Sequence, residues 1–343
     1  MQESEIRFIF DKISALRVGV IGDFAVDFYY DLQKNTNEFS LETRQQVWWG
    51  SRPRTSLGAA GNVVQNLAAL GVSELKAFGA IGQDMYGREM QHLMQSLGVD
   101  ITGIRVQDES WETCTYTKPL HQEAELNRID FGTHNTLSEE SFAETLKTLR
   151  TQLPKLDVLI INQQFDSPLL TRERVEQLNA LITIFPKVFV LADMRAFGKA
   201  LRGATLKVNT EELARLLDAK GHAAWTSEQC AFYGKQLADI ILGPVLITRG
   251  DQGIQYIEDG QVYQSAALPL TSELDTVGAG DTTVAAFAAC MGAGVPIQEA
   301  LSLANIAAAV TIQKLNQTGT ASQEEIIALA NAHHPSFGTE PEA

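Results

Sequence analysis

The chain has 343 residues, and its 42 acidic residues outnumber its 27 basic ones, which gives a formal net charge of −15. This excess of acids argues against nucleic acid and anionic membrane surfaces as partners, because both require a basic face. The length allows one large or two ordinary domains, and an apolar content of 45% is enough for a substantial core.

The first part of the chain alternates between predicted strands and helices. Residues 17–23 form an apolar run that ends in Gly-Asp, which is typical of a buried parallel strand that meets a loop. Residues 61–71 then place Val63, Leu67 and Leu70 at helical spacing and end at a glycine. The same criteria predict strands at 75–80, 157–161, 187–191 and 206–208, and helices around 90–97, 142–153 and 175–181.

The last third of the chain adds three predicted strands and three predicted helices. The strands lie at 245–248, 253–257 and 261–265, and the helices at 281–291, 296–315 and 323–331, before a tail that is predicted to be disordered. Strands and helices that alternate in this way predict an α/β fold with a mainly parallel sheet covered on both faces. Ligands are then expected at the carboxyl ends of the strands.

Two segments interrupt the alternation. Residues 41–57 and 112–131 are β-prone and lack helical periodicity, so we predict that they form a small antiparallel sheet that serves as a lid. The first segment contains the apolar run Val47-Trp48-Trp49, for which ordinary packing and a dimer contact are both open.

The sequence lacks targeting and redox signals. Its first residues are acidic rather than basic, and no stretch approaches the ~20 apolar residues of a membrane span. Cys114, Cys230 and Cys290 are an odd and widely spaced set. We therefore expect a soluble, cytoplasmic protein without disulfides or structural zinc.

The segment 275–281, with the sequence DTVGAGD, is the clearest candidate for chemistry. It opens a predicted helix, so the N–H groups of Gly278, Ala279 and Gly280 can converge on one point at the positive helix end. Asp281 at the rim of this anion hole could accept a proton from a hydroxyl that attacks phosphorus. The alternative is an ordinary N-cap on a glycine-rich turn. A dinucleotide fingerprint would need a third glycine, and no P-loop pattern is present.

Two further segments place polar residues or glycines after predicted strands. Asn209 and Glu212 lie on one face of a first helical turn and could hold Mg²⁺ through water, although the spacing also fits a capping box. Thr248, Gly250 and Gly253 allow the close approach of a nucleotide, which by itself is a weak signal.

The N-terminal part offers candidates for binding hydroxyl groups. Asp23 and Asp27 follow the first strand, and Gly58 and Asn62 lie where the first helix of the alternation begins. Carboxylates and amides at strand exits suit bidentate hydrogen bonding of vicinal hydroxyls, although each of these residues could equally be a plain cap.

Together these motifs resemble the ribokinase-like (PfkB) carbohydrate kinase family over nearly the whole chain. The resemblance is carried, in order, by GDFAVD at 22–27, GAAGN at 58–62, NTEE at 209–212, TRGDQG at 248–253, DTVGAGD at 275–281 and the run 304–320. Within the family, 22–27, 117–118, 127–131 and 304–320 are most similar to the heptose 7-phosphate kinase domain. The chain departs from that pattern between Phe39 and Leu57, in the extra residues Gln317-Thr318, and in having no HxGH nucleotidyltransferase motif.

The resemblance implies a ribokinase-like three-layer αβα sandwich with a mainly parallel central sheet and a small β-sheet lid. It implies one kinase domain over 1–335, with lid strands inserted at about 41–57 and 112–131, and a disordered tail at 336–343. Asp281 would be the catalytic base, and the amides of Gly278, Ala279 and Gly280 would stabilise the phosphoryl group.

The resemblance also implies roles for the other candidates. ATP would be lined by Asn209, Thr248, Gly250, Gly253 and Asn305, and Mg²⁺ would be organised through water by Asn209 and Glu212. The sugar would contact Asp23, Asp27, Gly58, Asn62, Lys118 and Arg128. A monovalent cation such as K⁺ could lie near Asp275 and the carbonyl of Val277.

The resulting hypothesis is an ATP-dependent kinase that phosphorylates a hydroxyl of a sugar or sugar phosphate. Arg52, Arg54, Lys118 and Arg128 lie in or beside the lid segments and could hold a phosphate already on the substrate. The alternatives are a kinase for a nucleoside or a free ketose or aldose, and a catalytically silent sugar-binding scaffold. Members of the family often pair through the lid, so we also expect a homodimer.

Overall fold

Nine strands form one central sheet in the computed structural model, which describes residues 1–333 except 109–110, 123, 271–273 and 316. The order is β14-β13-β12-β11-β10-β9-β1-β4-β5, and all neighbours from β12 to β5 pair in parallel. The parallel strands are β1 (Arg17–Gly22), β4 (Glu74–Ile81), β5 (Asp100–Val106), β9 (Val158–Gln163), β10 (Phe189–Met194), β11 (Thr205–Asn209) and β12 (Val245–Thr248). The antiparallel edge is formed by β13 (Ile254–Glu258) and β14 (Gln261–Ser265).

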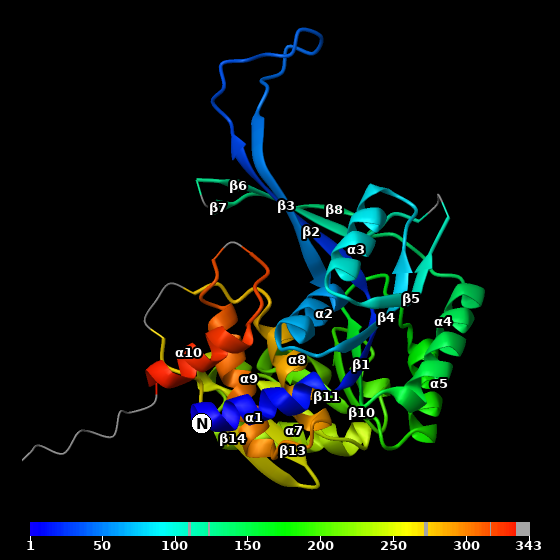
Figure 1. Ribbon diagram of the computed structural model, residues 1–343, viewed down its shortest axis with the longest axis vertical. Helices are drawn as coiled ribbons and strands as arrows, with labels where there is room; N and C mark the ends of the chain where they lie inside the picture. Colours follow the sequence, from blue (N-terminus) through cyan, green and yellow to red (C-terminus); the bar gives the residue numbers. More distant parts are fainter. Residues whose placement is uncertain (109–110, 123, 271–273, 316, 334–343) are drawn as a thin grey trace, which may run out of the picture.

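Helices cover both faces of this sheet, because each buried strand presents apolar side chains in both directions. In β9, Val158 and Ile160 belong to one apolar core, and Leu159 and Ile161 to the other. The first core is covered by α1 (Glu3–Ser14), α2 (Ala60–Ala69), α3 (Met85–Ser96), α8 (Ala279–Gly292), α9 (Ile297–Thr311) and α10 (Gln323–His333). The second is covered by α4 (Glu139–Gln152), α5 (Arg172–Ile184), α6 (Thr210–Leu216) and α7 (Ser227–Ile241), as Figure 1 shows in part.

The predicted three-layer αβα architecture is confirmed, with differences in detail. The structure adds α1, β5, α7 and several short 3₁₀ turns that the sequence analysis did not predict. The predicted helix 296–315 is shorter, since α9 ends at Thr311. The tail predicted at 336–343 lies outside the described residues. Within the part of the chain that is described, no helix is long and apolar enough to cross a membrane.

A second sheet of five strands forms the lid. It contains β2 (Phe24–Gln33), β3 (Trp49–Ala59), β6 (Thr115–His121), β7 (Ala124–Glu125) and β8 (Ile129–Phe131). The segment 112–131 therefore supplies strands as predicted, whereas 41–57 does so only from Trp49 onward. The sheet is not purely antiparallel as predicted, because β2 and β6 pair in parallel. The sequence analysis missed β2, because it continues from β1 after a single residue and no turn signal separates the two strands.

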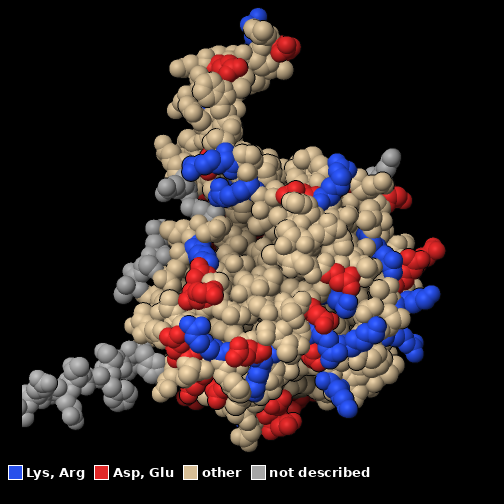
Figure 2. All heavy atoms as spheres, viewed as in Figure 1, with Lys and Arg blue, Asp and Glu red and all other residues tan. Residues whose placement is uncertain are grey.

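The lid stands above the body, and the β2–β3 hairpin projects farthest from it (Figure 1). Trp48 and Trp49 on this hairpin are 53% and 49% exposed, so ordinary core packing does not account for them. Figure 2 shows few charged side chains on the projecting part, whereas acidic and basic side chains are interspersed over the body.

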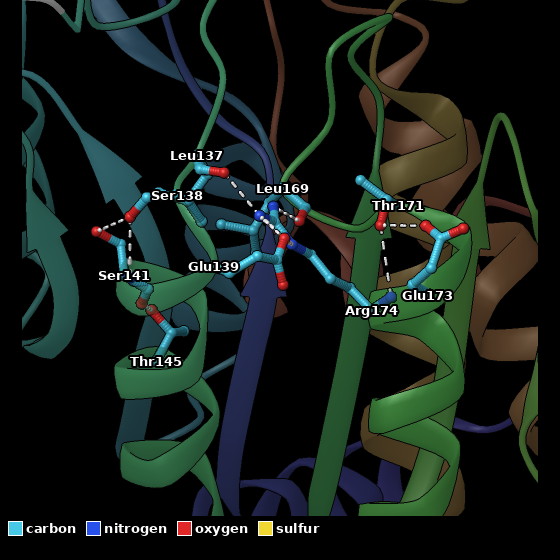
Figure 3. A network of polar contacts seen from close by, with 9 residues as sticks. All are labelled: Leu137, Ser138, Glu139, Ser141, Thr145, Leu169, Thr171, Glu173 and Arg174. Carbon is cyan, nitrogen blue, oxygen red and sulfur yellow. Dashed lines mark hydrogen bonds and ion pairs between the residues drawn. The ribbon is translucent and has the colours of Figure 1, made fainter.

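Arg174 of α5 anchors the segment that returns from the lid to the body (Figure 3). Its buried guanidinium donates to the carbonyl of Leu169 at 3.0 Å and to the carbonyl of Leu137 at 2.6 Å. It also pairs with Glu139 at 2.6 Å and lies over the ring of Phe142. One side chain thus joins the loop after β9 to the start of α4, at the base of the lid.

Candidate active site

The anion hole was predicted at the N-terminus of α8. Gly278 precedes the helix with φ of +82°, a left-handed conformation that glycine adopts without strain. A side chain at this position would also press on Asn62, whose Nδ2 lies 3.2 Å from where a Cβ would be. The N–H groups of Gly280 and Asp281 belong to the first helical turn, which has no preceding carbonyl to pair them. The N–H of Ala279 already donates to the carbonyl of Thr276 at 3.3 Å.

Asp281 is held beside this helix end by an amide network from α2. Asn62 donates from Nδ2 to Oδ2 of Asp281 at 2.7 Å. The Asn62 Oδ1 in turn accepts from Gln65 at 2.7 Å and from Asn66 at 3.1 Å, which fixes the orientation of the amide. Burial and the nearby carboxylate of Asp193 raise the pKa of Asp281 to about 7, against the opposing effects of Asn62 and Lys207. Such a pKa suits a general base that works near neutral pH.

A buried ion pair that the sequence analysis did not identify lies next to the anion hole. Lys207 in the middle of β11 contacts Asp193 near the end of β10, with Nζ 3.0 Å from Oδ2. A Cβ on Gly280 would lie 3.1 Å from the same Nζ. Burial works to lower the pKa of Lys207, but the carboxylates of Asp193, Glu212 and Asp281 outweigh it and leave the pKa raised. The ammonium is therefore charged and placed at the mouth of the anion hole.

The inner face of the lid carries a second polar cluster. Asp27 and Tyr29 of β2 lie opposite Lys118 of β6, with Lys118 Nζ 3.2 Å from Asp27 Oδ1 and 3.0 Å from the Tyr29 hydroxyl. A Cβ on Gly58 would lie 3.0 Å from Asp27 Oδ1, so glycine is needed to leave room for the carboxylate. Asp27, Lys118 and Gly58 are thus brought together as predicted.

Asp23 is placed differently from its predicted partners. Its carboxylate is buried and accepts three backbone N–H groups, those of Gln164 at 2.8 Å, Phe165 at 3.0 Å and Leu169 at 2.7 Å. Burial raises the pKa of Asp23 to about 6 despite these hydrogen bonds. Both oxygens therefore position the loop after β9, and the direct grip on a sugar hydroxyl that we predicted has no support in this arrangement.

Arg128 does not join Lys118. Its guanidinium pairs with Asp130 through two hydrogen bonds of 2.7 Å and lies over the ring of Tyr116. Arg52 and Arg54 instead line a cavity of about 650 Å³ between the lid and the loop after α9. Arg54 also lies over the Tyr29 ring, which connects this cavity to the Asp27 cluster. Asp31, Leu32, Leu120, Gln122, Leu315 and Gln317 complete the lining.

Asn209 and Glu212 form the capping box that was the alternative to a metal site. Glu212 N–H donates to Asn209 Oδ1 at 2.8 Å, and Asn209 N–H donates to Glu212 Oε2 at 2.7 Å. The box engages one oxygen of each side chain and leaves the Glu212 carboxylate a second oxygen. Mg²⁺ is usually held by one or two carboxylates together with water and phosphate oxygens, and not by a cage made of protein ligands alone. A single carboxylate with a free oxygen, as in Glu212, fits that mode of binding.

The predicted nucleotide residues fall into two groups. Asn209, Thr248 and Gly250 line one cavity of about 330 Å³ at the carboxyl ends of β11 and β12. Asn305 faces a different segment, since its Nδ2 donates to the carbonyls of Ser265 at 3.0 Å and Ala266 at 3.2 Å. Gly253 packs against the same segment, because a Cβ there would lie 2.1 Å from the carbonyl of Ser265.

Asp275 lies in the turn before α8, where the cation site was predicted. Its Oδ1 accepts the N–H of Val277 at 3.0 Å, and its own N–H donates to the carbonyl of Ile312 at 2.8 Å. These contacts tie the turn to the end of α9.

A carboxylate with a raised pKa lies beside a helix N-terminus and a charged lysine on an α/β fold, an arrangement that is compatible with a phosphotransferase site. Comparison with known proteins agrees with this class, since the model of the family described as "pfkB family carbohydrate kinase" matches residues 17–324. The chain belongs to the pfkB family of carbohydrate kinases, and it is a sugar kinase by that membership.

Curated relatives and solved structures resemble the chain over most of its length. The "Bifunctional protein HldE" of Geotalea uraniireducens is 29% identical over 98% of this chain and 67% of its own length. The protein of the same name from Pseudomonas aeruginosa is 28% identical over 92% of this chain, which spans only 63% of that relative. Escherichia coli phosphofructokinase-2 in complex with potassium superposes with a TM-score of 0.74 at 16% identity, over 92% of this chain and 99% of its own. Arabidopsis thaliana ribokinase complexed with ribose and ATP gives 0.67 at 20% identity, over 92% and 98%.

Proposed function

We propose that the protein transfers the γ-phosphoryl group of ATP to a hydroxyl of a sugar or sugar phosphate. The observation that carries the proposal is the position of Asp281, which is held by Asn62 next to the first-turn amides of α8 and to Lys207. Asp281 accepts the hydroxyl proton as the sugar oxygen bonds to the γ-phosphorus. The bond from that phosphorus to the bridging oxygen breaks, and ADP leaves.

The anion hole and Lys207 act on the charge that is spread over the transferred group. Amides of Gly280 and Asp281 and the ammonium of Lys207 are fixed before the reaction, so they stabilise that charge without reorganising. Glu212, together with Asn209, would hold Mg²⁺ through water, and the ion when bound neutralises charge on the ATP phosphates. We also place a potassium ion near Asp275 in this proposal, because the similar E. coli phosphofructokinase-2 has a structure in complex with potassium.

The substrate we favour already carries a phosphate, as a heptose 7-phosphate does. Arg52 and Arg54 line the lid cavity, and Arg54 lies over the ring of Tyr29, which belongs to the Asp27 cluster. A sugar held at Asp27 would then direct a distal phosphate toward these guanidinium groups. Arg52 itself pairs with Asp31, which also lines the cavity, so a phosphate would have to compete with that carboxylate. Arg128, which pairs with Asp130, is not part of the cavity lining, and we therefore prefer the two arginines of the cavity as the phosphate contact.

An ADP-release assay tests the proposal, with ATP, Mg²⁺ and a panel of ribose, fructose 6-phosphate, a heptose 7-phosphate and a nucleoside. We expect turnover that is fastest with a phosphorylated sugar. Turnover with the free sugar or the nucleoside alone would identify the alternative kinase class. Sugar binding without turnover on any of them would favour the silent scaffold.

The phosphate contact has its own test. Replacing Arg52 and Arg54 by Gln should raise KM for the phosphorylated sugar by at least about 10-fold, because each lost charge-assisted hydrogen bond costs roughly 1.5–3 kcal/mol. Arg88→Gln on α3, outside that cavity, is the matched control. Equal KM values for the double variant and the control would reject the phosphate contact.

We also propose that the lid mediates a homodimer. The exposed Trp48 and Trp49 and an apolar cavity of about 480 Å³ on the outer lid face, lined by Phe28, Tyr30 and Phe131 among others, support a second copy as the occupant. These parts of the lid are apolar and are not covered by the rest of the chain, so a second copy could bury them.

A further inference from the structure

The extra residues Gln317-Thr318 reach the sugar side of the site. They lie in the loop after α9, which Lys314 anchors by donating to the carbonyl of Thr320 at 2.6 Å and pairing with Glu325 at 2.7 Å. From this anchored loop, Thr318 extends to the inner face of the lid. Its methyl group lies 3.7 Å from where a Cβ on Gly278 would be, so the residue also borders the start of the anion hole.

Thr318 closes a chain of hydrogen bonds on Asp27. Lys118 donates to the Tyr29 hydroxyl at 3.0 Å, the Tyr29 and Thr318 hydroxyls lie 2.9 Å apart, and Thr318 donates to Asp27 Oδ2. With that last bond directed to Asp27, the Tyr29 hydroxyl must be the donor to Thr318. Both hydroxyl hydrogens in the chain then have a defined acceptor, and such chains strengthen each member.

The two oxygens of Asp27 are therefore not equivalent. Oδ2 accepts from a hydroxyl of the protein itself, whereas Oδ1 has only its ion-pair contact with Lys118 and no hydrogen-bond partner among the described residues. Asp27 is 4% exposed, and the Lys118 ammonium 3.2 Å from Oδ1 offsets part of the cost of burying its charge. Oδ1, beside Gly58, is the oxygen left for a substrate hydroxyl.

We propose that Thr318 is a specificity-determining residue that takes the place of one substrate hydroxyl on Asp27. The site then holds the sugar at this point through a single hydroxyl on Oδ1, and not through the vicinal pair that a free carboxylate would grip. The inference rests on the proposed sugar kinase activity and adds to it which oxygen of Asp27 recognises the sugar.

Steady-state kinetics of Thr318→Val, Thr318→Ser and Thr318→Ala test the inference, with the phosphorylated sugar of the panel that the wild-type protein turns over fastest. Valine removes the hydroxyl at nearly constant volume, and serine retains it. We expect Thr318→Val to raise the sugar KM by about 10-fold with the KM for ATP unchanged, and Thr318→Ser to stay within about twofold of the wild type. Thr320→Val is the matched loop control, since Thr320 contacts Lys314 through its backbone carbonyl.

Thr318→Ala tests the specificity itself, because it frees Oδ2 and leaves room for a second hydroxyl. We expect the ratio of kcat/KM between the best and the second-best sugar of the panel to fall by about 10-fold. An unchanged ratio, an unchanged sugar KM in Thr318→Val, or an equal rise of both KM values would overturn the inference. These results leave the kinase activity standing, whereas a wild-type protein that turns over no sugar would refute the proposed function itself.

Discussion

Asp281 combines two properties that oppose each other, since a half-buried carboxylate with a raised pKa is a useful base and an unfavourable charge. Its neighbours Asp193 and Asp27 add repulsion, while Asn62 and Lys207 compensate in part. The charged form of Asp281 is therefore destabilised by its surroundings, and the fold alone does not require a carboxylate at this position. This is the pattern expected where function and stability are in conflict.

The pKa of Asp281 predicts the pH dependence of the reaction. With a pKa raised to about 7, the base is protonated and inactive at low pH, so kcat/KM should rise about tenfold per pH unit up to pH 7 and then level off. A pH profile of initial rates at saturating Mg²⁺ measures this. An ordinary carboxylate with a pKa near 4 would instead give a flat profile from pH 5 to 8.

The same shift predicts that Asp281→Asn stabilises the fold. Because the folded pKa lies above the unfolded one, the folded state binds the proton more tightly, and stability is lost as pH rises from about 4 to 7. Asparagine removes that loss, so the variant should gain on the order of 2 kcal/mol at pH 8 and almost nothing at pH 4. Urea unfolding at both pH values measures the gain, and equal stability of the two proteins at pH 8 would contradict the buried charge.

At the scale of elements, Arg174 and Asp23 together hold the base of the lid. Asp23 fixes the N–H of Leu169 and Arg174 fixes its carbonyl, so one peptide segment after β9 is held from both sides. The segment that returns from the lid is tied to the same guanidinium through Leu137 (Figure 3). These contacts explain why two buried charged residues lie outside the catalytic centre.

Arg174→Met should destabilise the protein markedly. It leaves two buried carbonyls without their donor, which predicts a loss of about 2–4 kcal/mol in the free energy of unfolding. Arg172→Met, two residues earlier and on the exposed side of α5, is the matched control and should change stability by less than about 0.5 kcal/mol. Denaturant unfolding measures the free energy of unfolding of both variants. A loss for Arg174→Met no larger than that for Arg172→Met would show that the contacts of the Arg174 guanidinium do not stabilise the fold.

The elements also show what the sequence could predict. The turn 275–281 was found because glycines, a helix start and a carboxylate are all local signals. The Lys207–Asp193 pair was missed because its partners lie on different strands, and a buried lysine within a strand was the only local sign. The partners of Thr318 are 289 and 291 residues away, so no spacing rule could connect them. Asp23 was misassigned because its three donors come from a loop 141 to 146 residues later.

At the scale of the whole molecule, the charge of −15 does not oppose phosphate binding. In the proposed mechanism, phosphate would be bound locally by the amides of α8, by Lys207 and by the two arginines of the lid cavity. Acidic and basic side chains are mixed on the face of the body in Figure 2. The lid is the part of the molecule that leaves the largest aromatic side chains exposed, on the hairpin that projects from the body.

The proposed dimer predicts that Trp48→Ser combined with Trp49→Ser weakens self-association. Two half-exposed indoles at an interface would contribute several kcal/mol, so the double variant should sediment as a monomer where the wild-type chain is a dimer. Analytical ultracentrifugation at micromolar concentration distinguishes them, with Phe8→Ser on the exposed side of α1 as the control. A wild-type monomer at that concentration would reject the dimer.

The central claim is that Asp281 is the base of a sugar kinase, and the most direct measurement is turnover of Asp281→Asn beside ATP binding of the same variant. We predict that ADP release with the best sugar of the panel falls by at least ~10²-fold while the dissociation constant for ATP stays within about threefold of the wild type. Turnover within a few-fold of the wild type would contradict it.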